Sequence, residues 1–438
     1  MKIIILGAGI SGLATAWFLK NAYGSSLELT ILEKKQQPGG WIQTINKQGY
    51  LFELGPRSCR ASGAGEATLR LAGELGLQDE IIWADTCASN RYLWYREKLR
   101  QLPSSPAGLL AQPWLWPAIP GLVQDLVDRR KPPRHEESIA QFTTRRFNQF
   151  ITDTLIDPLV SGIYAGRPDR LSAAAAFPSL PAWEKERGSV LLGLIAAAKN
   201  ASPKKHPRAL FSFRQGLSTL TKTLANKLQD SLVYNCSVES IQIGTNECEA
   251  VCQHASYKSD YLISTLPAHS LAALLPESPL AAPMKHMPFR SVTTVSCGYP
   301  HAYALRGFGY LIPSNQKQLA LGVTWDSSTF PQQNQHPHET RLTVMLRPEV
   351  LHNAKQTALD TLAKHLGITE NPECLIENYV KNAIPQYVIG HQKMLKLLAE
   401  EEARLNYRLR ILGNSFTGVA VNDCVAAAET LASQFSQN

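Results

Sequence analysis

The sequence predicts an α/β plus α+β fold in which the first domain is discontinuous and other domains are inserted into it. The chain opens on an apolar run, Lys2–Leu6, followed by a glycine-rich turn and a helical pattern. A second strand, glycine-containing loop and helix follow one another between Leu409 and Asp423. Between these ends, residues 100–204 have mainly helical patterns, and residues 290–350 are rich in β-forming side chains. The two ends are therefore expected to form one domain around the inserted segments.

The turn after the first strand has the sequence Gly7-Ala8-Gly9-Ile10-Ser11-Gly12. Gly7 permits the tight turn, Gly9 lets a pyrophosphate approach the backbone, and Gly12 lets the helix pack closely on the strand. The free N–H groups at the helix start would face the phosphates. Glu33 ends the second strand, about twenty residues further on, where a carboxylate binds a ribose 2′-hydroxyl and repels a 2′-phosphate. The motif predicts a Rossmann-like dinucleotide site that favours FAD or NAD over NADP.

The segment after Glu33 favours FAD over NAD. Paired glycines at 39 and 40 lie within residues 37–44, and residues 46–49 read as a hairpin turn. Residues 50–58, which include Gly55-Pro56-Arg57-Ser58, then form a short strand and a loop. This arrangement resembles the second FAD motif of the monoamine oxidase and phytoene desaturase superfamily.

Length and composition narrow the class of protein. With 438 residues, 44% hydrophobic and 18% charged, the chain is long enough for two or three domains. No stretch approaches the ~18 apolar residues of a membrane span, and the N-terminal strand belongs to the fold rather than to a signal peptide. The net charge of +8 includes no dense basic run, so nucleic-acid binding is not expected. A diffuse positive charge suits an anionic substrate, an anionic membrane surface or an ordinary solvated surface.

The eight cysteines are scattered and contain no CxxC pair. Cys248, Cys252 and His254 could hold a metal ion, but an alternating hairpin explains them more simply, so no metal site is predicted. Free thiols of this kind suit a reducing cytoplasm, which is the predicted compartment.

Tryptophans lie beside a basic cluster in the helical region. Trp114 and Trp116 fall within residues 107–127, followed by Asp128-Arg-Arg-Lys131. This combination suits a membrane interface. An ordinary helical subdomain with buried tryptophans is the alternative, and the pattern alone does not decide between them.

Five stretches, spread over nearly the whole chain, resemble the family of oxygen-dependent protoporphyrinogen oxidases. The stretches are residues 39–42 with 52–57, residues 90–93, residues 157–166 with 177–178, residues 307–313 with 326–327, and residues 384–387 with 413–423. The resemblance implies an FAD-binding domain, a mixed β-sheet substrate domain and a helical membrane-associating domain. The corresponding boundaries are 1–85, 205–270 and 395–438 for the FAD domain, 86–99 and 271–394 for the substrate domain, and 100–204 for the helical domain.

The resemblance also implies roles for individual residues. Residues that would contact FAD, held without a covalent bond, are Gly7, Ala8, Gly9, Ile10, Ser11, Gly12, Glu33, Lys34, Trp41, Gly55, Pro56, Arg57, Ser58, Val238, Asn414, Val419, Ala420 and Val421. Residues that would line the tetrapyrrole slot are Arg91, Gly162, Phe308, Leu311, Thr324 and Met345. Arg91 would bind a propionate through two parallel hydrogen bonds. Thr324 stands where the family pattern has an aliphatic residue. No histidine or carboxylate is assigned as a catalytic acid or base.

The implied reaction is the oxidation of protoporphyrinogen IX to protoporphyrin IX in haem biosynthesis. FAD would take a hydride in each of three two-electron cycles, and O2 would reoxidise it to give H2O2. Three alternatives stay open: oxidation of coproporphyrinogen III, a flavin amine oxidase or carotenoid desaturase, and a non-enzymatic flavoprotein or tetrapyrrole-binding module. The expected location is cytoplasmic, peripheral on the inner face of the cytoplasmic membrane. Product transfer to a ferrochelatase and a homodimer are also left open.

Overall fold

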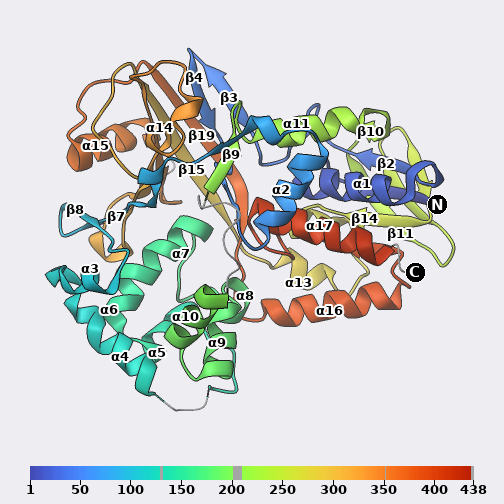
Figure 1. The fold of residues 1–438 in the computed structure, drawn as a ribbon. Helices are drawn as coiled ribbons and strands as arrows, with labels where there is room; N and C mark the ends of the chain where they lie inside the picture. The colour runs from blue at the N-terminus through green and yellow to red at the C-terminus, as the bar shows by residue number, and fades with distance from the viewer. Residues whose placement is uncertain (129–131, 201–209, 351, 436–438) are drawn as a thin grey trace. The chain divides into compact units, whose positions relative to one another are not determined.

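The computed structural model describes residues 1–128, 132–200, 210–350 and 352–435 (Figure 1). The chain divides into two compact units, which are described separately. Unit 1 comprises Met1–Ala84, Arg208–Met287 and Lys393–Asn438, and unit 2 comprises Asp85–Pro207 and Pro288–Gln392. Residues 100–204, assigned from the sequence to a separate helical domain, lie within unit 2, so the three-domain boundaries stay a prediction.

Unit 1 is built on a parallel sheet of five strands among its described residues, in the order β10-β2-β1-β14-β20. Its strands are β1 (Lys2–Leu6), β2 (Glu28–Leu32), β10 (Leu232–Val233), β14 (Tyr261–Ser264) and β20 (Leu409–Ile411). The N-terminal strand therefore has β2 on one side and β14 on the other. The strand order reverses at β1, and ligands of such sheets bind beside the carboxyl ends of the strands at that point.

Three helices supply the buried side chains that pack with this sheet. They are α1 (Ile10–Tyr23), α11 (Ser218–Lys227) and α17 (Val421–Phe435), and α1 packs against both of the others. Leu13 and Leu19 of α1, Leu220 of α11 and Val425 of α17 are fully buried in one hydrophobic core. The helical spacing of apolar residues in these segments is therefore explained by burial rather than by a cofactor.

Smaller elements complete unit 1. Its remaining strands are β3 (Thr44–Lys47), β4 (Tyr50–Glu53), β5 (Cys59–Arg60), β6 (Ile81–Trp83), β9 (Leu210–Phe213), β11 (Val238–Ile243), β12 (Cys248–Cys252) and β13 (Ser256–Ser259). Its remaining helices are η1 (Gly24–Ser26), α2 (Gly65–Glu74), η2 (Gln78–Glu80), η6 (Gln229–Ser231), α12 (Ala268–Leu274) and α13 (Ala281–Lys285), and α16 (His391–Arg404) begins at the boundary with unit 2. The expected hairpin at residues 46–49 is present as β3 paired with β4.

Unit 2 contains a mixed sheet of seven strands among its described residues, in the order β19-β15-β18-β17-β16-β7-β8. The strands are β7 (Arg91–Tyr95), β8 (Lys98–Gln101), β15 (Phe289–Tyr299), β16 (Gly309–Leu311), β17 (Ala320–Trp325), β18 (Thr340–Leu346) and β19 (Cys374–Pro385). The pair β7–β16 is parallel, and the other pairs are antiparallel.

The two faces of this sheet differ in chemistry. One face packs against α15 (Ala354–Leu366) and contributes Val295, Val323 and Val344 to a hydrophobic core. Because successive side chains of a strand point to opposite faces, the neighbouring residues Thr324 and Thr343 belong to the other face. The remaining short helices near the sheet are η3 (Thr86–Ser89), η7 (Ser314–Gln316), α14 (Asp326–Thr329) and η8 (Pro331–Gln333).

The helical part of unit 2 is held together by a buried ion pair. Its helices are α3 (Pro106–Leu110), η4 (Pro113–Ala118), α4 (Ile119–Val127), α5 (Ile139–Arg146), α6 (Gln149–Ile151), the π-helical η5 (Thr152–Ile156), α7 (Asp157–Tyr164), α8 (Ala173–Ala176), α9 (Ser179–Arg187) and α10 (Val190–Asn200). The fully buried Arg146 donates to Asp125 Oδ1 at 2.5 Å, and Ser189 Oγ donates to Asp125 Oδ2 at 2.6 Å. This network joins α4, α5 and the start of α10.

A disulfide corrects the expectation that the cysteines are free thiols. Cys236 and Cys252 are bonded, with Cα atoms 6.1 Å apart. Pairing of β11 with β12 puts Val238 opposite Cys252, and this brings Cys236, two residues earlier, within reach. Cys252 is thus not available as a metal ligand, and no group of three metal-binding side chains occurs in the described residues.

Candidate functional site

The N-terminal glycines form a narrow backbone cradle at the end of β1. Gly7 has φ +98°, a conformation that side chains rarely adopt. Gly9 forms a bridge with Gly39, whose N–H donates to Ala8 O at 2.8 Å. A Cβ on Gly40 would lie 3.2 Å from Gly9 Cα. The motif at 7–12 and the paired glycines at 39–40 are therefore parts of one structure.

Gly12 has the packing role that the motif predicts. A Cβ at this position would lie 2.0 Å from the carbonyl oxygen of Gly7, so only glycine allows α1 to approach the end of β1 this closely. Ile10 and Ser11 are buried in the first turn of the same helix. Gly9 is the N-cap residue, and no side chain caps the helix. The first backbone N–H groups of α1, which no side chain caps, therefore suit binding of an anion such as a phosphate.

The Glu33 carboxylate is fixed at the end of β2 by backbone donors. Ala8 N–H donates to Glu33 Oε2 at 2.8 Å, and Lys35 N–H donates to Glu33 Oε1 at 2.9 Å. Glu33 is 8% exposed, whereas the adjacent Lys34 is exposed. A carboxylate oxygen can accept more than one hydrogen bond, so the group is oriented by the protein and suits a ribose hydroxyl.

The predicted adenine contact, Val238, lies beside Glu33 through the backbone. Val238 begins β11, and the N–H of Cys236 donates to Glu33 O at 2.9 Å. The structure therefore brings Val238 and Glu33 into the same part of unit 1, although about two hundred residues separate them in the chain.

The predicted flavin-lining loop is held close to Trp41. A Cβ on Gly55 would lie 1.9 Å from Trp41 O, so this close approach requires glycine. Trp41 itself is 39% exposed. The hairpin before the loop is pinned to α11, because Leu217 N–H donates to Glu53 Oε1 at 2.6 Å. Pro56, Arg57 and Ser58 follow Gly55 and are all half-buried.

The C-terminal segment returns to the end of the same sheet. Leu412 N–H donates to Ser264 O at 3.0 Å, and Gly413, with φ +117°, follows directly. Asn414 continues this loop, and Val419, Ala420 and Val421 lead into α17. Ala420 N–H donates to Asp423 Oδ2 at 3.2 Å. The Asp423 carboxylate therefore fixes the backbone at the start of α17.

Cys424 behaves as a packing residue. It is buried in the same core as α1, and burial raises the pKa of its thiol to about 11. A protonated thiol at neutral pH is a poor nucleophile. A covalent flavin linkage through Cys424 is therefore not favoured.

All the predicted cofactor residues thus lie in unit 1, around the carboxyl ends of its parallel strands. The glycine cradle, the uncapped start of α1 and the Glu33 carboxylate fit a dinucleotide such as FAD.

The six predicted substrate residues all lie in unit 2, and four of them occupy adjacent rows of one sheet face. One row pairs Arg91 with Gly309 and Gly309 with Thr324. The next row pairs Leu311 with Gly322 and Gly322 with Met345. Paired residues of neighbouring strands point to the same face. The sheet therefore brings together Arg91, Leu311, Thr324 and Met345, which are widely separated in the sequence.

Gly162 and Phe308 lie beside this group, Gly162 next to the Leu311 side chain and Phe308 next to Arg91. Helix α7 packs against β16 and β17, and a Cβ on Gly162 would lie 2.9 Å from Leu311 Cδ2. The Arg91 guanidinium lies over the Phe308 ring, 4.8 Å from its centre. A cation–π contact of this kind orients the guanidinium.

A carboxylate that the sequence analysis left without a role lies on the same face. Asp326 Oδ1 accepts a hydrogen bond from Thr324 Oγ1 at 2.9 Å, and Asp326 Oδ2 accepts one from Thr343 Oγ1 at 2.6 Å. The pair Asp326-Ser327 belongs to the stretches that carry the family resemblance. The sequence offered one indication of this role: Asp326 lies two residues after the predicted substrate residue Thr324, within the β-rich residues 290–350.

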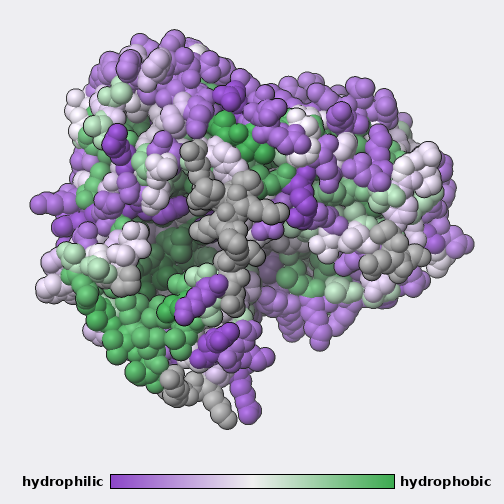
Figure 2. All heavy atoms as spheres, viewed as in Figure 1, coloured by the Kyte–Doolittle hydropathy of each residue, from purple (hydrophilic) through white to green (hydrophobic). Residues whose placement is uncertain are grey.

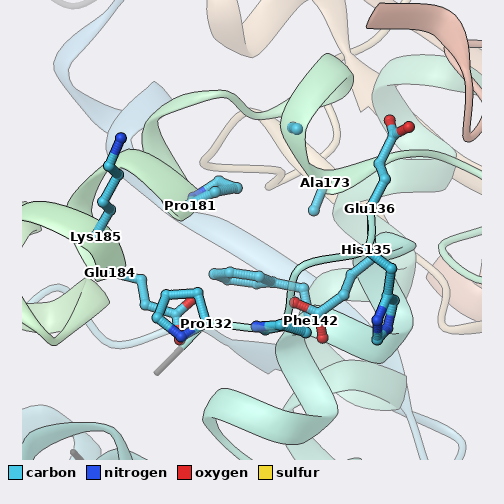
Figure 3. Close-up of a pocket in the computed structure, with 11 residues that line it drawn as sticks. Pro132, His135, Glu136, Phe142, Ala173, Pro181, Glu184 and Lys185 are labelled. Atoms are coloured by element: carbon cyan, nitrogen blue, oxygen red, sulfur yellow. The ribbon is translucent and has the colours of Figure 1, made fainter. Parts of the chain in front are cut away.

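The hollow drawn in Figure 3 lies elsewhere in unit 2 and holds none of the predicted residues. It is lined by Phe142, Glu137 and Glu184 among others. Both of these carboxylates bond to Arg145 at 2.7 Å, so the acidic groups of the hollow serve the helical packing.

Exposed apolar side chains gather on the helical part of unit 2. Figure 2 shows hydrophobic residues over the region where Figure 1 places α4 and α10. The exposed large apolar side chains of α3, η4, α4 and α10 are Leu110, Trp116, Val123, Leu126, Val127, Leu192, Leu194 and Ile195, which we call the apolar patch. Helices α4 and α10 pack together, and η4 packs against α3 and α4, so these residues lie on connected elements.

Trp116 fits the membrane-interface interpretation of the helical region, and Trp114 fits the alternative of an ordinary helical subdomain. Trp116 is 54% exposed, whereas Trp114 is half-buried and packs on Tyr95 with ring centres 5.6 Å apart. Of the basic cluster, residues 129–131 lie outside the described residues. None of the described helices combines the length and hydrophobicity that crossing a membrane requires.

Comparisons of the sequence and of the whole fold with known proteins identify the family. Residues 10–434 match the family described as flavin containing amine oxidoreductase. The protoporphyrinogen oxidase of Bos taurus is 32% identical over 99% of this chain and 98% of its own length. That of Homo sapiens is 31% identical over 98% of this chain and 97% of its own length. A solved structure from Exiguobacterium sp. 255-15 has a TM-score of 0.85 at 23% identity, covering 100% of this chain and 98% of that chain.

The chain therefore belongs to the flavin-containing amine oxidoreductases, which are FAD-dependent oxidoreductases with an α/β fold and mixed sheets. Within that family it groups with the protoporphyrinogen oxidases. The predictions of an FAD enzyme and of this family are confirmed, whereas the roles of individual residues stay predictions.

Proposed function

We propose that the protein oxidises protoporphyrinogen IX to protoporphyrin IX in haem biosynthesis. The observation that carries the proposal is the similarity to protoporphyrinogen oxidases over nearly the full length of both chains. The conversion removes six hydrogens, so three two-electron cycles are needed. Bound FAD would supply the oxidising power, and O2 would accept the electrons.

The residues of the unit 2 sheet face would bind and orient the tetrapyrrole. Arg91 would grip a propionate through its planar guanidinium, held over Phe308. Leu311 and Met345 would contact the apolar macrocycle, and Gly162 lets the Leu311 side chain pack directly against α7, since a Cβ on Gly162 would lie 2.9 Å from Leu311 Cδ2. Orientation and exclusion of water are then the chief tasks of the protein.

Oxygen uptake with each porphyrinogen tests the proposal. The purified protein, loaded with FAD, is given protoporphyrinogen IX or coproporphyrinogen III, and the products are followed by porphyrin fluorescence. We expect faster oxidation of protoporphyrinogen, with H2O2 as the product of O2. Preference for coproporphyrinogen, or no oxidation of either compound by a fully flavinated protein, would refute the proposal.

We also propose that the apolar patch rests on an anionic membrane surface, as a peripheral contact. Trp116, Val127 and Leu194 are each more than half exposed, and exposed side chains of this size gathered on neighbouring helices mark an interaction surface. The net charge of +8 would assist binding to anionic lipid. Location on the inner face of the cytoplasmic membrane, transfer of product to a ferrochelatase and a homodimer are further predictions.

Vesicle sedimentation tests the membrane contact. Val127→Glu with Leu194→Glu should reduce co-sedimentation with anionic phospholipid vesicles at least tenfold. Leu319→Glu is the matched control, since Leu319 is 56% exposed but lies just before β17, outside the patch. Equal sedimentation of the patch variant and the control would refute the role of the patch.

A further inference from the structure

The face of the unit 2 sheet that carries the predicted substrate residues also carries a continuous row of hydroxyl groups. Thr324 pairs with Thr343, and Thr343 pairs with Ser296 on the next strand. Ser296 Oγ and Thr343 Oγ1 lie 3.2 Å apart, within hydrogen-bond distance. Ser296 and Thr343 are 1% exposed and Thr324 is 7% exposed. The row is therefore a buried polar structure.

This row ends on the Asp326 carboxylate. Thr324 Oγ1 donates to Oδ1 at 2.9 Å, and Thr343 Oγ1 donates to Oδ2 at 2.6 Å. Each carboxylate oxygen thus has its own hydroxyl donor from a different strand. The Thr324 hydroxyl is already hydrogen-bonded to Asp326. This bond explains how a threonine can occupy a position where the family pattern has an aliphatic residue.

The backbone around Asp326 is fixed as well. Phe330 N–H donates to Asp326 O at 2.9 Å, which closes the short turn α14. The neighbouring Ser327 Oγ accepts from Arg341 N–H at 2.8 Å. A negative charge held this firmly cannot reorient during a reaction, and such preorganised charge is the most effective kind for stabilising charge that develops in a substrate.

We propose that Asp326 is a further residue of the substrate site, whose fixed negative charge stabilises the cationic tetrapyrrole formed during oxidation. The inference rests on the proposed function. Transfer of a hydride from a meso carbon to bound FAD would take two electrons and one hydrogen from the macrocycle and leave it with one positive charge. A proton from a pyrrole N–H would then pass to solvent, which restores neutrality. The carboxylate changes no covalent bond, and it lowers the energy of the charged state by Coulomb attraction.

Charge removal by an isosteric substitution is the central test. In Asp326→Asn the amide oxygen and NH2 group can both still bond to the threonine hydroxyls, because a hydroxyl donates and accepts. We expect the rate constant of flavin reduction, measured anaerobically by stopped flow, to fall 10- to 100-fold, with little change in the dissociation constant of protoporphyrin IX. Asp360→Asn is the control, because Asp360 is an exposed carboxylate on α15, and it should leave the rate unchanged.

A spectroscopic measurement separates charge stabilisation from a structural role. Bound N-methylprotoporphyrin is titrated with acid, and protonation of its inner nitrogens is followed by visible absorption. A nearby carboxylate favours the cation, so the midpoint should lie about one pH unit higher for the wild type than for Asp326→Asn. Thr343→Val, which keeps size but removes one hydroxyl donor, should give an intermediate midpoint and a smaller loss of rate. If Asp326→Asn does not fold, Thr343→Val and Asp326→Glu carry the same comparison.

The outcomes are distinct. A wild-type rate in Asp326→Asn, or a slow rate with an unchanged porphyrin midpoint, would overturn the role of Asp326 while the wild-type enzyme still oxidises protoporphyrinogen. Failure of the proposed function itself would appear as a flavinated wild type that oxidises no porphyrinogen.

Discussion

Substitution of Gly12 by alanine should weaken FAD binding by separating α1 from β1. In an ordinary helix this change is favourable by about 1 kcal/mol, because alanine loses less backbone entropy than glycine. Here the new Cβ would lie 2.0 Å from Gly7 O, whereas ordinary contact begins at 3.4 Å. The obstacle is backbone rather than a flexible side chain, so the helix must retreat by about 1 Å or more. Overpacking of this kind costs about 1–3 kcal/mol, which outweighs the helical gain.

The retreat of α1 would also move the N–H groups that face the cofactor. Because FAD binds the folded state, lost affinity lowers the thermal midpoint further by mass action. We expect the purified Gly12→Ala protein to hold less FAD, with a release midpoint several degrees lower when flavin fluorescence is followed on heating. Gly73→Ala is the matched control. Gly73 lies in α2, its new Cβ would lie 3.6 Å from Gln78 Nε2, at ordinary contact distance, and the substitution should be neutral or stabilising. Full flavin content and an unchanged midpoint in Gly12→Ala would refute the packing argument.

Three further predictions concern substrate binding, the disulfide and pH. Arg91→Ala should raise KM for protoporphyrinogen about tenfold or more, since a charged hydrogen bond is worth about 1.5–3 kcal/mol, and unchanged steady-state kinetics would exclude the role. Replacing Cys236 and Cys252 with serine should lower the free energy of unfolding by about 3 kcal/mol for a sequence separation of 16, and a thiol titration that finds all eight cysteines free in unreduced protein would contradict the bond. Burial lowers the pKa of His365 to about 4. The unfolded chain therefore binds the proton more readily, and the free energy of unfolding should fall by about 3 kcal/mol as the pH drops from 6.5 to about 4. Urea titrations at several pH values should show a smaller dependence of this free energy on pH in His365→Gln than in the wild type.

The sequence predicted most accurately those elements whose local pattern is decided by burial. The first strand has the expected bounds, because its apolar run is continuous and ends at a glycine. The tight turn at Gly7 and the close packing at Gly12 could be predicted from spacing, because both depend on local backbone geometry, whereas the role of Gly9 toward a pyrophosphate stays a prediction.

What could not be predicted depends on pairing between distant strands. The bond between Cys236 and Cys252 follows from the register of β11 with β12, which no local pattern specifies. The parallel pairing of β7 with β16 has the same origin. Asp326 is the clearest case, since its partner Thr343 lies on a different strand and the contact exists only when β17 and β18 are in register.

The stability contribution of the paired Thr324 and Thr343 hydroxyls does not by itself explain why threonines are present on this face. A buried hydroxyl that makes one internal hydrogen bond contributes about 1 kcal/mol net, and a further buried methyl group contributes about 0.8 kcal/mol, so the two choices are close in stability. The opposite face of the same strands is apolar instead, with Val323 and Val344 fully buried. Thr324 and Thr343, on the face that carries the predicted substrate residues, therefore give about the same stability as valine would. What the two threonines add, and valines cannot, is a pair of donors that hold the Asp326 carboxylate in one orientation.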